Sequence, residues 1–167
     1  MIRMVFMLLI AAWASTSLGA TSPFKVSLPK GFTAAAPATN GPARVFAYSR
    51  PSVAPNVKTL FQVTVIAIPP EGRGDSLESL LAGMLRGVER RRTEFKKSDP
   101  VKTRLGSLEA AAVDWEGKGE GHDMRGRMLC AVSDGTLFCV HFQDVAQGWE
   151  KSQSELNKAL ETFTVSK

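Results

Sequence analysis

The chain has 167 residues, 44% of them apolar and 22% charged, with a formal net charge of +5. This composition is typical of a folded globular protein and excludes an intrinsically disordered one. A charge of this size favours only weak contact with anionic surfaces. The densest basic run, Arg90 to Arg92, has only Phe95 nearby as a stacking residue, so we expect an exposed, solvated run and no specific nucleic-acid site.

The first twenty residues have the layout of a secretory signal peptide. One positive charge, Arg3, precedes an apolar run that ends at Trp13, and small residues follow it. Cleavage after Ala14 or after Ala20 fits this pattern. The run is shorter than the roughly 20 residues that a spanning helix needs, although an uncleaved anchor is the alternative. We therefore expect export to the periplasm or the extracellular space, and a single mature domain over 21–167.

The first half of that domain alternates predicted strands with loops. Alternating or β-branched residues predict strands over 24–28, 44–48 and 61–68. The segments 33–42 and 51–55 between them are rich in proline and small residues, and these indicate loops.

A helix is predicted to begin at Asp75. The Asp75 carboxylate can cap the first turn, and Glu78 completes a capping-box arrangement. The apolar residues that follow recur at helical spacing and predict one core-facing stripe: Leu77, Leu80, Leu81, Met84, Leu85 and Val88.

Two hairpins and a terminal helix are predicted for the second half. The hairpins pair 101–105 with 108–115, and 124–132 with 137–142. The glycine-rich segment 117–123 is expected to form a mobile tip between them. The terminal helix should begin at or near Asp144 and bury its apolar residues: Trp149, Leu156, Ala159, Leu160 and Phe163. Hairpins with separate helices indicate a mostly antiparallel α+β domain.

The only two cysteines, Cys130 and Cys139, are predicted to form a disulfide across the second of these hairpins. A two-residue turn at Asp134-Gly135 would place them opposite each other. The same register would put Phe138, Val140 and Phe142 on the other face. A three-residue loop would shift the register by one residue and leave two free thiols.

The order of these parts resembles the PsbP-like and DcrB-like sandwich family. The residues that carry this resemblance are the opening Phe24-x-Val26-x-Leu28-Pro29-x-Gly31-Phe32, the helix start Ser76-Leu77, the hairpin Leu105-Gly106-Ser107-Leu108-Glu109-Ala110, the turn Asp134-Gly135 and the helix end Thr162-Phe163. The resemblance implies an antiparallel sheet of about six or seven strands covered by two main helices. Family members serve as photosystem subunits, envelope proteins or chaperones, so the resemblance implies no catalytic residue and no cofactor.

The candidate metal ligands are spread along the chain. They are His122, Asp123, His141 and the two cysteines. His141 should face Met128, six residues along the strand from His122, which separates the two histidines by roughly 20 Å. A compact zinc site needs three or four converging ligands, so we expect no metal.

Other chemistry is also weakly supported. The serines include no nucleophile-elbow motif. Asp114 and Glu116 should share one face of a strand, where they are expected to be solvated, and Glu120 lies on the adjacent tip. The segment Gly117 to Gly121 lacks the following helix that a phosphate cradle needs.

We therefore expect an exported, non-catalytic binding or assembly module that recognises an envelope or secreted protein. The alternative is a carrier of a lipid or hydrophobic peptide in a groove between the sheet and a helix, and an uncovered sheet face would favour it. A small hydrolase would require His122 or His141 to meet a nucleophile or carboxylate in a pocket.

Overall fold

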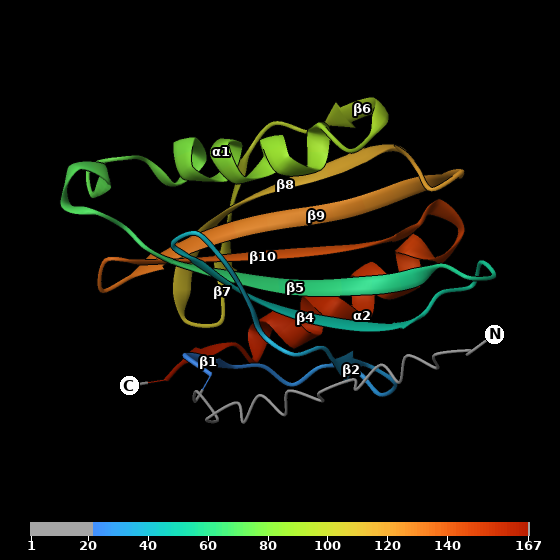
Figure 1. The fold of residues 1–167 in the computed structure, drawn as a ribbon, viewed down its shortest axis with the longest axis horizontal. Helices are drawn as coiled ribbons and strands as arrows, with labels where there is room; N and C mark the ends of the chain where they lie inside the picture. Colours follow the sequence, from blue (N-terminus) through green and yellow to red (C-terminus); the bar gives the residue numbers. More distant parts are fainter. Residues whose placement is uncertain (1–21, 167) are drawn as a thin grey trace, which may run out of the picture.

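The computed structural model describes residues 22–166, so the predicted signal peptide lies outside the described residues. Two helices and eleven strands are found within this range (Figure 1). The helices are α1 (Leu77–Glu89) and α2 (Trp149–Glu161). The strands are β1 (Phe24–Lys25), β2 (Thr33–Ala34), β3 (Ala38–Asn40), β4 (Ala43–Pro51), β5 (Lys58–Ala67), β6 (Thr93–Lys97), β7 (Val101–Leu105), β8 (Leu108–Gly119), β9 (His122–Ser133), β10 (Thr136–Val145) and β11 (Thr164–Val165).

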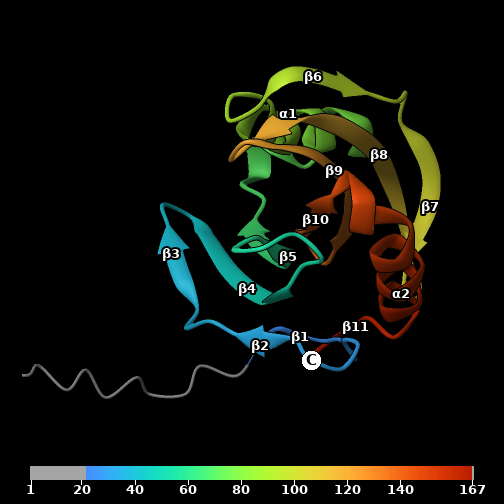
Figure 2. The same ribbon diagram turned by 90° about the vertical axis from the view of Figure 1, so that its right-hand side faces the viewer.

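Nine of the strands in this range form one antiparallel sheet. Its order is β2-β4-β5-β10-β9-β8-β6, with β3 also paired to β4 and β7 to β8. The sheet curls strongly, so β3 and β4 stand away from α1 (Figure 2). β1 and β11 form a separate two-stranded sheet. The predicted α+β class is confirmed, and the sheet has more strands than expected because the short β2, β3 and β6 add to its edges.

The two faces of the sheet carry separate apolar clusters. The face toward α2 is built largely of aromatic and branched side chains, including Phe138, Val140 and Phe142 of β10. The face toward α1 includes Met128 and both cysteines. This separation confirms the predicted alternation along β10 and its register.

The helix α1 packs its apolar stripe on β8 and β9. Leu81, Leu85 and Val88 are buried, as the stripe predicted. The predicted cap was wrong by one residue. Ser76 is the N-cap, and its hydroxyl accepts a hydrogen bond from the Ser79 N–H at 3.2 Å, so the helix begins after Asp75.

The start of the terminal helix also differs from the prediction. Asp144 lies inside β10, and a 3₁₀ turn, Ala146–Gly148, separates that strand from α2. Asp144 is 2% exposed and acts as a hub of hydrogen bonds. Thr59 and Ser152 donate hydroxyl hydrogen bonds to its Oδ2 at 2.8 and 2.6 Å, and Ser52 donates one to its Oδ1. A buried carboxylate with these partners ties α2 to β5 and to the end of β4.

The segment 117–123 is not a mobile tip. β8 runs through Gly119 and β9 begins at His122, so only Glu120 and Gly121 form the turn. Both have positive φ, 54° and 78°, as a tight two-residue hairpin turn requires. Gly117 and Gly119 of β8 instead leave space for the Arg92 side chain, which lies against this strand.

Candidate functional site

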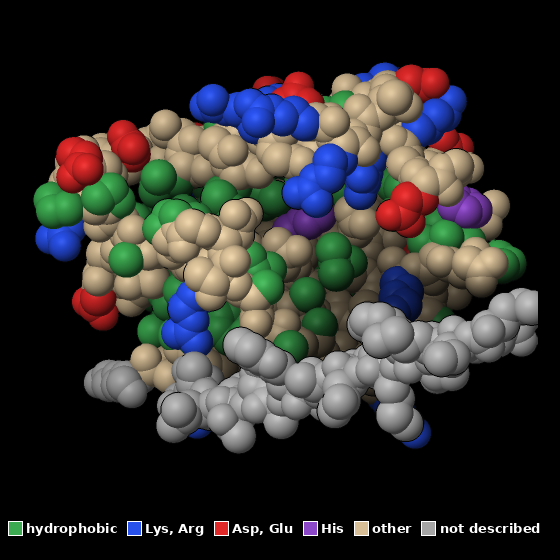
Figure 3. Space-filling view, in the orientation of Figure 1, with side chains coloured by type: hydrophobic (Ala, Val, Ile, Leu, Met, Phe, Trp, Pro, Cys, Tyr) green, Lys and Arg blue, Asp and Glu red, His purple; other side chains and the backbone are tan. Residues whose placement is uncertain are grey.

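A groove lies between α1 and the strands that α1 does not cover. Its volume is about 500 Å³. One wall is α1, the other is the β3–β4 edge, and the floor is formed by β5, β10 and β9. The lining residues include Val45, Leu60, Gln62, Thr64, Ile66, Met84, Gly87, Val88, Arg91, Arg92, Glu120, Met128, Cys139, His141 and Gln143. Figure 3 looks onto this hollow, with basic side chains along its upper rim and a histidine inside it.

The groove exists because α1 covers only part of the sheet. The helix packs mainly on β8 and β9 and covers β4 and β5 much less. Val45 and Ile66 of those strands are therefore only half-buried. On the helix side, Gly87 lines the groove without a side chain, and this leaves more space beside the helix. An incompletely covered sheet face is the feature that the carrier alternative called for.

His141 lies on the floor of the groove. It pairs with Met128 of β9, as the register predicted, and with Gln62 of β5. Burial, with additional repulsion from Arg92 and Arg91, lowers the pKa of His141 to about 3. The imidazole is therefore neutral at physiological pH, and its buried Nε2 has no hydrogen-bond partner. The Trp115 ring lies 5.7 Å from the His141 ring, between their centroids.

Arg92 closes one end of the groove. Its guanidinium carbon lies 5.5 Å from the Trp115 ring centroid, and its Nη2 donates to Gln143 Oε1 at 2.8 Å. Added Cβ atoms at Gly117 and Gly119 would fall 3.2 and 3.0 Å from Arg92 side-chain atoms, so these glycines make room for it. The prediction that the whole basic run is exposed is thus wrong for Arg92. Its side chain is half-buried because it folds back over β8. Arg90 and Arg91 are exposed as predicted.

The cysteine pair lies beneath α1 and borders the same groove. Cys130 faces Cys139, their Cα atoms are 4.2 Å apart, and the structure joins their sulfurs. Asp134 and Gly135 both have positive φ, 48° and 72°, which makes the two-residue turn possible. The predicted register is confirmed. The alternative with a three-residue loop is wrong.

The histidines do not converge. His122 lies at the first position of β9 beside the turn, and His141 lies opposite Met128 farther along the sheet. Within residues 22–166, no three metal-ligating side chains come close enough to hold an ion. No hydrogen bond joins His141 to a serine or a carboxylate among these residues.

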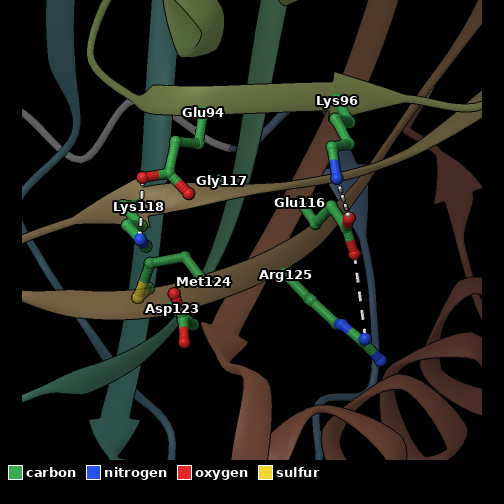
Figure 4. Close-up of a pocket in the computed structure, with 8 residues that line it drawn as sticks. All are labelled: Glu94, Lys96, Glu116, Gly117, Lys118, Asp123, Met124 and Arg125. Atoms are coloured by element: carbon green, nitrogen blue, oxygen red, sulfur yellow. Dashed lines mark hydrogen bonds and ion pairs between the residues drawn. The ribbon is translucent and has the colours of Figure 1, made fainter.

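The carboxylates of β8 are held by basic neighbours. Arg127 binds Asp114 through two hydrogen bonds of 2.7 Å, and this interaction raises the pKa of the Arg127 guanidinium. Glu116 forms ion pairs with Lys96 at 3.6 Å and Arg125 at 3.7 Å (Figure 4). The two acids share a face, as predicted, but each is neutralised separately. The arrangement suits sheet stability better than acid–base chemistry.

The surface hollow drawn in Figure 4 is a network of exposed ion pairs. Lys118 bridges to Glu94 at 2.7 Å, beside the pairs made by Glu116. Its volume is about 240 Å³, half that of the groove. Exposed pairs of this kind contribute little to binding or stability. The groove under α1 is the candidate site because it has α1 and the β3–β4 edge as walls and the open sheet as its floor.

Fold and site together define an α+β sandwich with an open groove between one helix and its sheet. No helix in the described part of the chain is long and apolar enough to cross a membrane. No protein-family model matches the sequence, and no curated protein matches it. Solved structures do resemble it, at low sequence identity.

One of them is LpqN of Mycobacterium tuberculosis, described as involved in cell envelope biogenesis. It shares 12% identity at a TM-score of 0.60, over 86% of this chain and 83% of that one. Another is PA94, a protein of unknown function from Pseudomonas aeruginosa, with 14% identity at a TM-score of 0.56, over 82% of this chain and 98% of that one. Cyanobacterial PsbP from Synechocystis matches with 9% identity at a TM-score of 0.49, over 93% of this chain and 100% of that one. The sandwich fold that the resemblance implied is confirmed by the likeness to LpqN and PA94, and this likeness extends to the fold alone.

Proposed function

We propose that this protein is an exported, non-catalytic binding module that carries a hydrophobic molecule in the groove between α1 and β4–β5. One observation carries the proposal: part of the α1 face of the sheet is left uncovered and lines a space of about 500 Å³. That volume lies within the range of small-molecule sites. The lining is divided about equally between apolar side chains such as Met84 and Ile66 and polar ones such as Gln62 and Thr64.

A non-catalytic role is supported by the surroundings of His141. Its low pKa keeps it neutral, and it has neither a nucleophile nor a carboxylate as hydrogen-bond partner among the described residues. A general base is most effective when its own pKa lies near the working pH. His141 serves better as a buried part of a binding surface.

Export is proposed from the N-terminal segment and is supported by the cysteine pair, since disulfides persist outside the cytoplasm. The likeness to LpqN, a protein of envelope biogenesis, agrees with it. N-terminal sequencing of the secreted or periplasmic protein should give Ser15 or Thr21 as its first residue. An intact Met1 in the membrane pellet would contradict cleavage.

The groove is tested by filling it from α1. Gly87 lines the groove, whereas Gly83, one turn earlier, is exposed and has no atom within 4 Å of an added Cβ. Gly87→Leu should place a side chain in the groove, and Gly83→Leu should place one in solvent. Glycine within a helix costs about 1 kcal/mol relative to alanine, so neither substitution should lower stability.

The measurement is fluorescence of the neutral probe N-phenyl-1-naphthylamine on titration with each protein. Wild type and Gly83→Leu should bind the probe, and Gly87→Leu should bind it at least tenfold more weakly. Equal binding by both variants would place the probe elsewhere. If folded wild-type protein binds no probe, the carrier role is wrong, and recognition of an envelope or secreted protein becomes the better candidate. Native capture from envelope extract then tests that role.

A further inference from the structure

One end of the groove holds two guanidinium groups and few acceptors. Arg91 and Arg92 both line this end. Neither forms an ion pair with a carboxylate of residues 22–166. The Arg91 Nε donates to the Gly87 carbonyl at 3.0 Å, which leaves its two terminal nitrogens for another acceptor. Glu120 also lines this end, so the local balance is one net positive charge.

Unpartnered buried nitrogens gather at the same end. They are Arg92 Nε and His141 Nε2, which belong to residues that line the groove, and Trp115 Nε1, whose residue packs beside them without lining it. Their side chains form one stack, since Trp115 lies within 6 Å of both Arg92 and His141. Most buried polar atoms in folded proteins have a hydrogen-bond partner, so three exceptions in one cluster require an explanation. Arg92 Nε and Trp115 Nε1 are donors, and together with the positive charge of the two arginines they make an environment that an anion stabilises.

Arg92 is also held in place before any ligand arrives. Its Nη2 is bonded to Gln143 and its Nη1 to the Arg91 carbonyl, while the guanidinium lies over Trp115. Burial lowers the pKa of Arg92, with Arg91 lowering it and Glu120 raising it in smaller measure, but a guanidinium remains charged. A fixed guanidinium loses little entropy on binding a carboxylate or phosphate.

The rest of the groove has a different character. Away from the arginines it is lined by apolar side chains such as Val45, Ile66 and Met84 and by uncharged polar ones, Asn40, Gln62 and Thr64, so it offers no charge to a ligand. A ligand complementary to the whole groove therefore needs two parts, an anionic group at one end and an apolar part at the other.

We infer that the groove binds a single-chain amphiphile with an anionic head group, a carboxylate or a phosphate. The head lies at Arg91 and Arg92, and the chain lies along Met84, Ile66 and Val45. This inference rests on the proposed carrier function and adds the chemistry of the ligand to it. Guanidinium groups bind both kinds of head group through paired hydrogen bonds, so the shared feature is the anionic charge.

The test compares probes that share a twelve-carbon chain, each below its micelle concentration. Dodecanoate and dodecyl phosphate carry an anionic head, and dodecyl glucoside carries a neutral one. Each is titrated against bound N-phenyl-1-naphthylamine, and inorganic phosphate is tested alone. Both anionic probes should displace the fluorophore at concentrations at least tenfold lower than dodecyl glucoside. Inorganic phosphate should displace none, because it lacks the chain.

The matched variants are Arg91→Gln and Arg90→Gln. Both remove one charge from the end of α1, but Arg90 does not line the groove. Arg91→Gln should weaken the anionic probes about tenfold or more, the effect of losing one charge-assisted hydrogen bond, and should leave dodecyl glucoside unchanged. Arg90→Gln should change neither. Arg91 is chosen over Arg92 because Arg92 also packs on Trp115, so its loss affects folding.

The failures of the two proposals are distinguishable. Equal displacement by neutral and anionic probes, or equal effects of Arg91→Gln and Arg90→Gln, overturns the anionic head group and leaves the carrier function standing. Tight binding of inorganic phosphate alone also overturns the amphiphile. No binding of N-phenyl-1-naphthylamine or of any chain-bearing probe to the folded protein overturns the carrier function itself.

Discussion

The indole of Trp115 lies across the backbone of Gly126 on the neighbouring strand, and an added Cβ at Gly126 would overlap the indole ring. This contact lets Trp115 of β8 span β9 and reach His141 of β10. Phe95 stacks on the same ring with centroids 5.9 Å apart, and Arg92 lies over it. One glycine thus determines how the end of the groove is packed.

Gly126→Ala should destabilise the protein, since Trp115 is 3% exposed and an added Cβ would overlap its ring. Overpacking of a core position typically costs about 1–3 kcal/mol. Urea unfolding of the variant measures this loss. The matched test is a double-mutant cycle with Trp115→Ala. In that background Gly126→Ala should cost much less, and full additivity would show that the ring is not what the Cβ meets.

Arg92→Gln should lower the free energy of unfolding by about 1–2 kcal/mol. It removes the stacking on Trp115 and a charge-assisted hydrogen bond to Gln143. Arg90→Gln changes the charge equally at an exposed position and should stay within about 0.5 kcal/mol of wild type. Chemical denaturation of both variants decides the point. Equal stabilities of the two variants would show that Arg92 contributes no more than an exposed, solvated arginine, as the sequence predicted.

Local patterns explain what could be predicted. The stripe of α1 and the Asp134-Gly135 turn depend on residues a few positions apart, so spacing alone identified them. The register of β9 and β10 follows from that turn, which is why the Cys130–Cys139 pairing could be counted out along the hairpin. The short β2 and β6 carry no such pattern and form because longer strands offer them an edge.

Long-range packing explains what could not be predicted. The sequence predicted a helix start at or near Asp144 and missed its buried role. Its hydrogen-bond partners Ser52 and Thr59 lie 92 and 85 residues earlier in the chain, where local spacing cannot reveal them. Arg92 looked like one of three solvated arginines, because its contact with Trp115 requires α1 to end above β8. The groove depends on how far α1 extends over a curled sheet, and no local spacing encodes that.

Cys130 and Cys139 should be oxidised in the exported protein. Alkylation of the denatured protein should add no label before reduction and two labels after it, as read by mass spectrometry. The closed loop is short, with a sequence separation of 9, so the bond should contribute about 2–3 kcal/mol at most. Two labels without reductant would show free thiols. A Cys130→Ala, Cys139→Ala double variant should remain folded but unfold at lower urea concentration.

Stability should fall as the pH is lowered because His141 is buried in its neutral form. Its pKa is lowered from 6.5 to about 3 by burial and by Arg92 and Arg91, so between these values the unfolded chain binds a proton that the folded chain does not. The stabilisation is therefore fully present above the unfolded pKa and is lost as the pH falls below it. Linkage gives a loss of about 2 kcal/mol between pH 7 and pH 5.

The matched variant for this effect is His141→Phe, which keeps an aromatic ring beside Trp115 and cannot be protonated. Urea unfolding of both proteins at pH 7 and pH 5 separates His141 from the carboxylates, which titrate in both. The variant should lose about 2 kcal/mol less than wild type over this interval, and it should also lack the unpartnered Nε2. Parallel pH profiles for the two proteins would mean that His141 is protonated in the folded state as readily as in the unfolded chain. A protonated His141 beside Trp115 would then need an anionic partner.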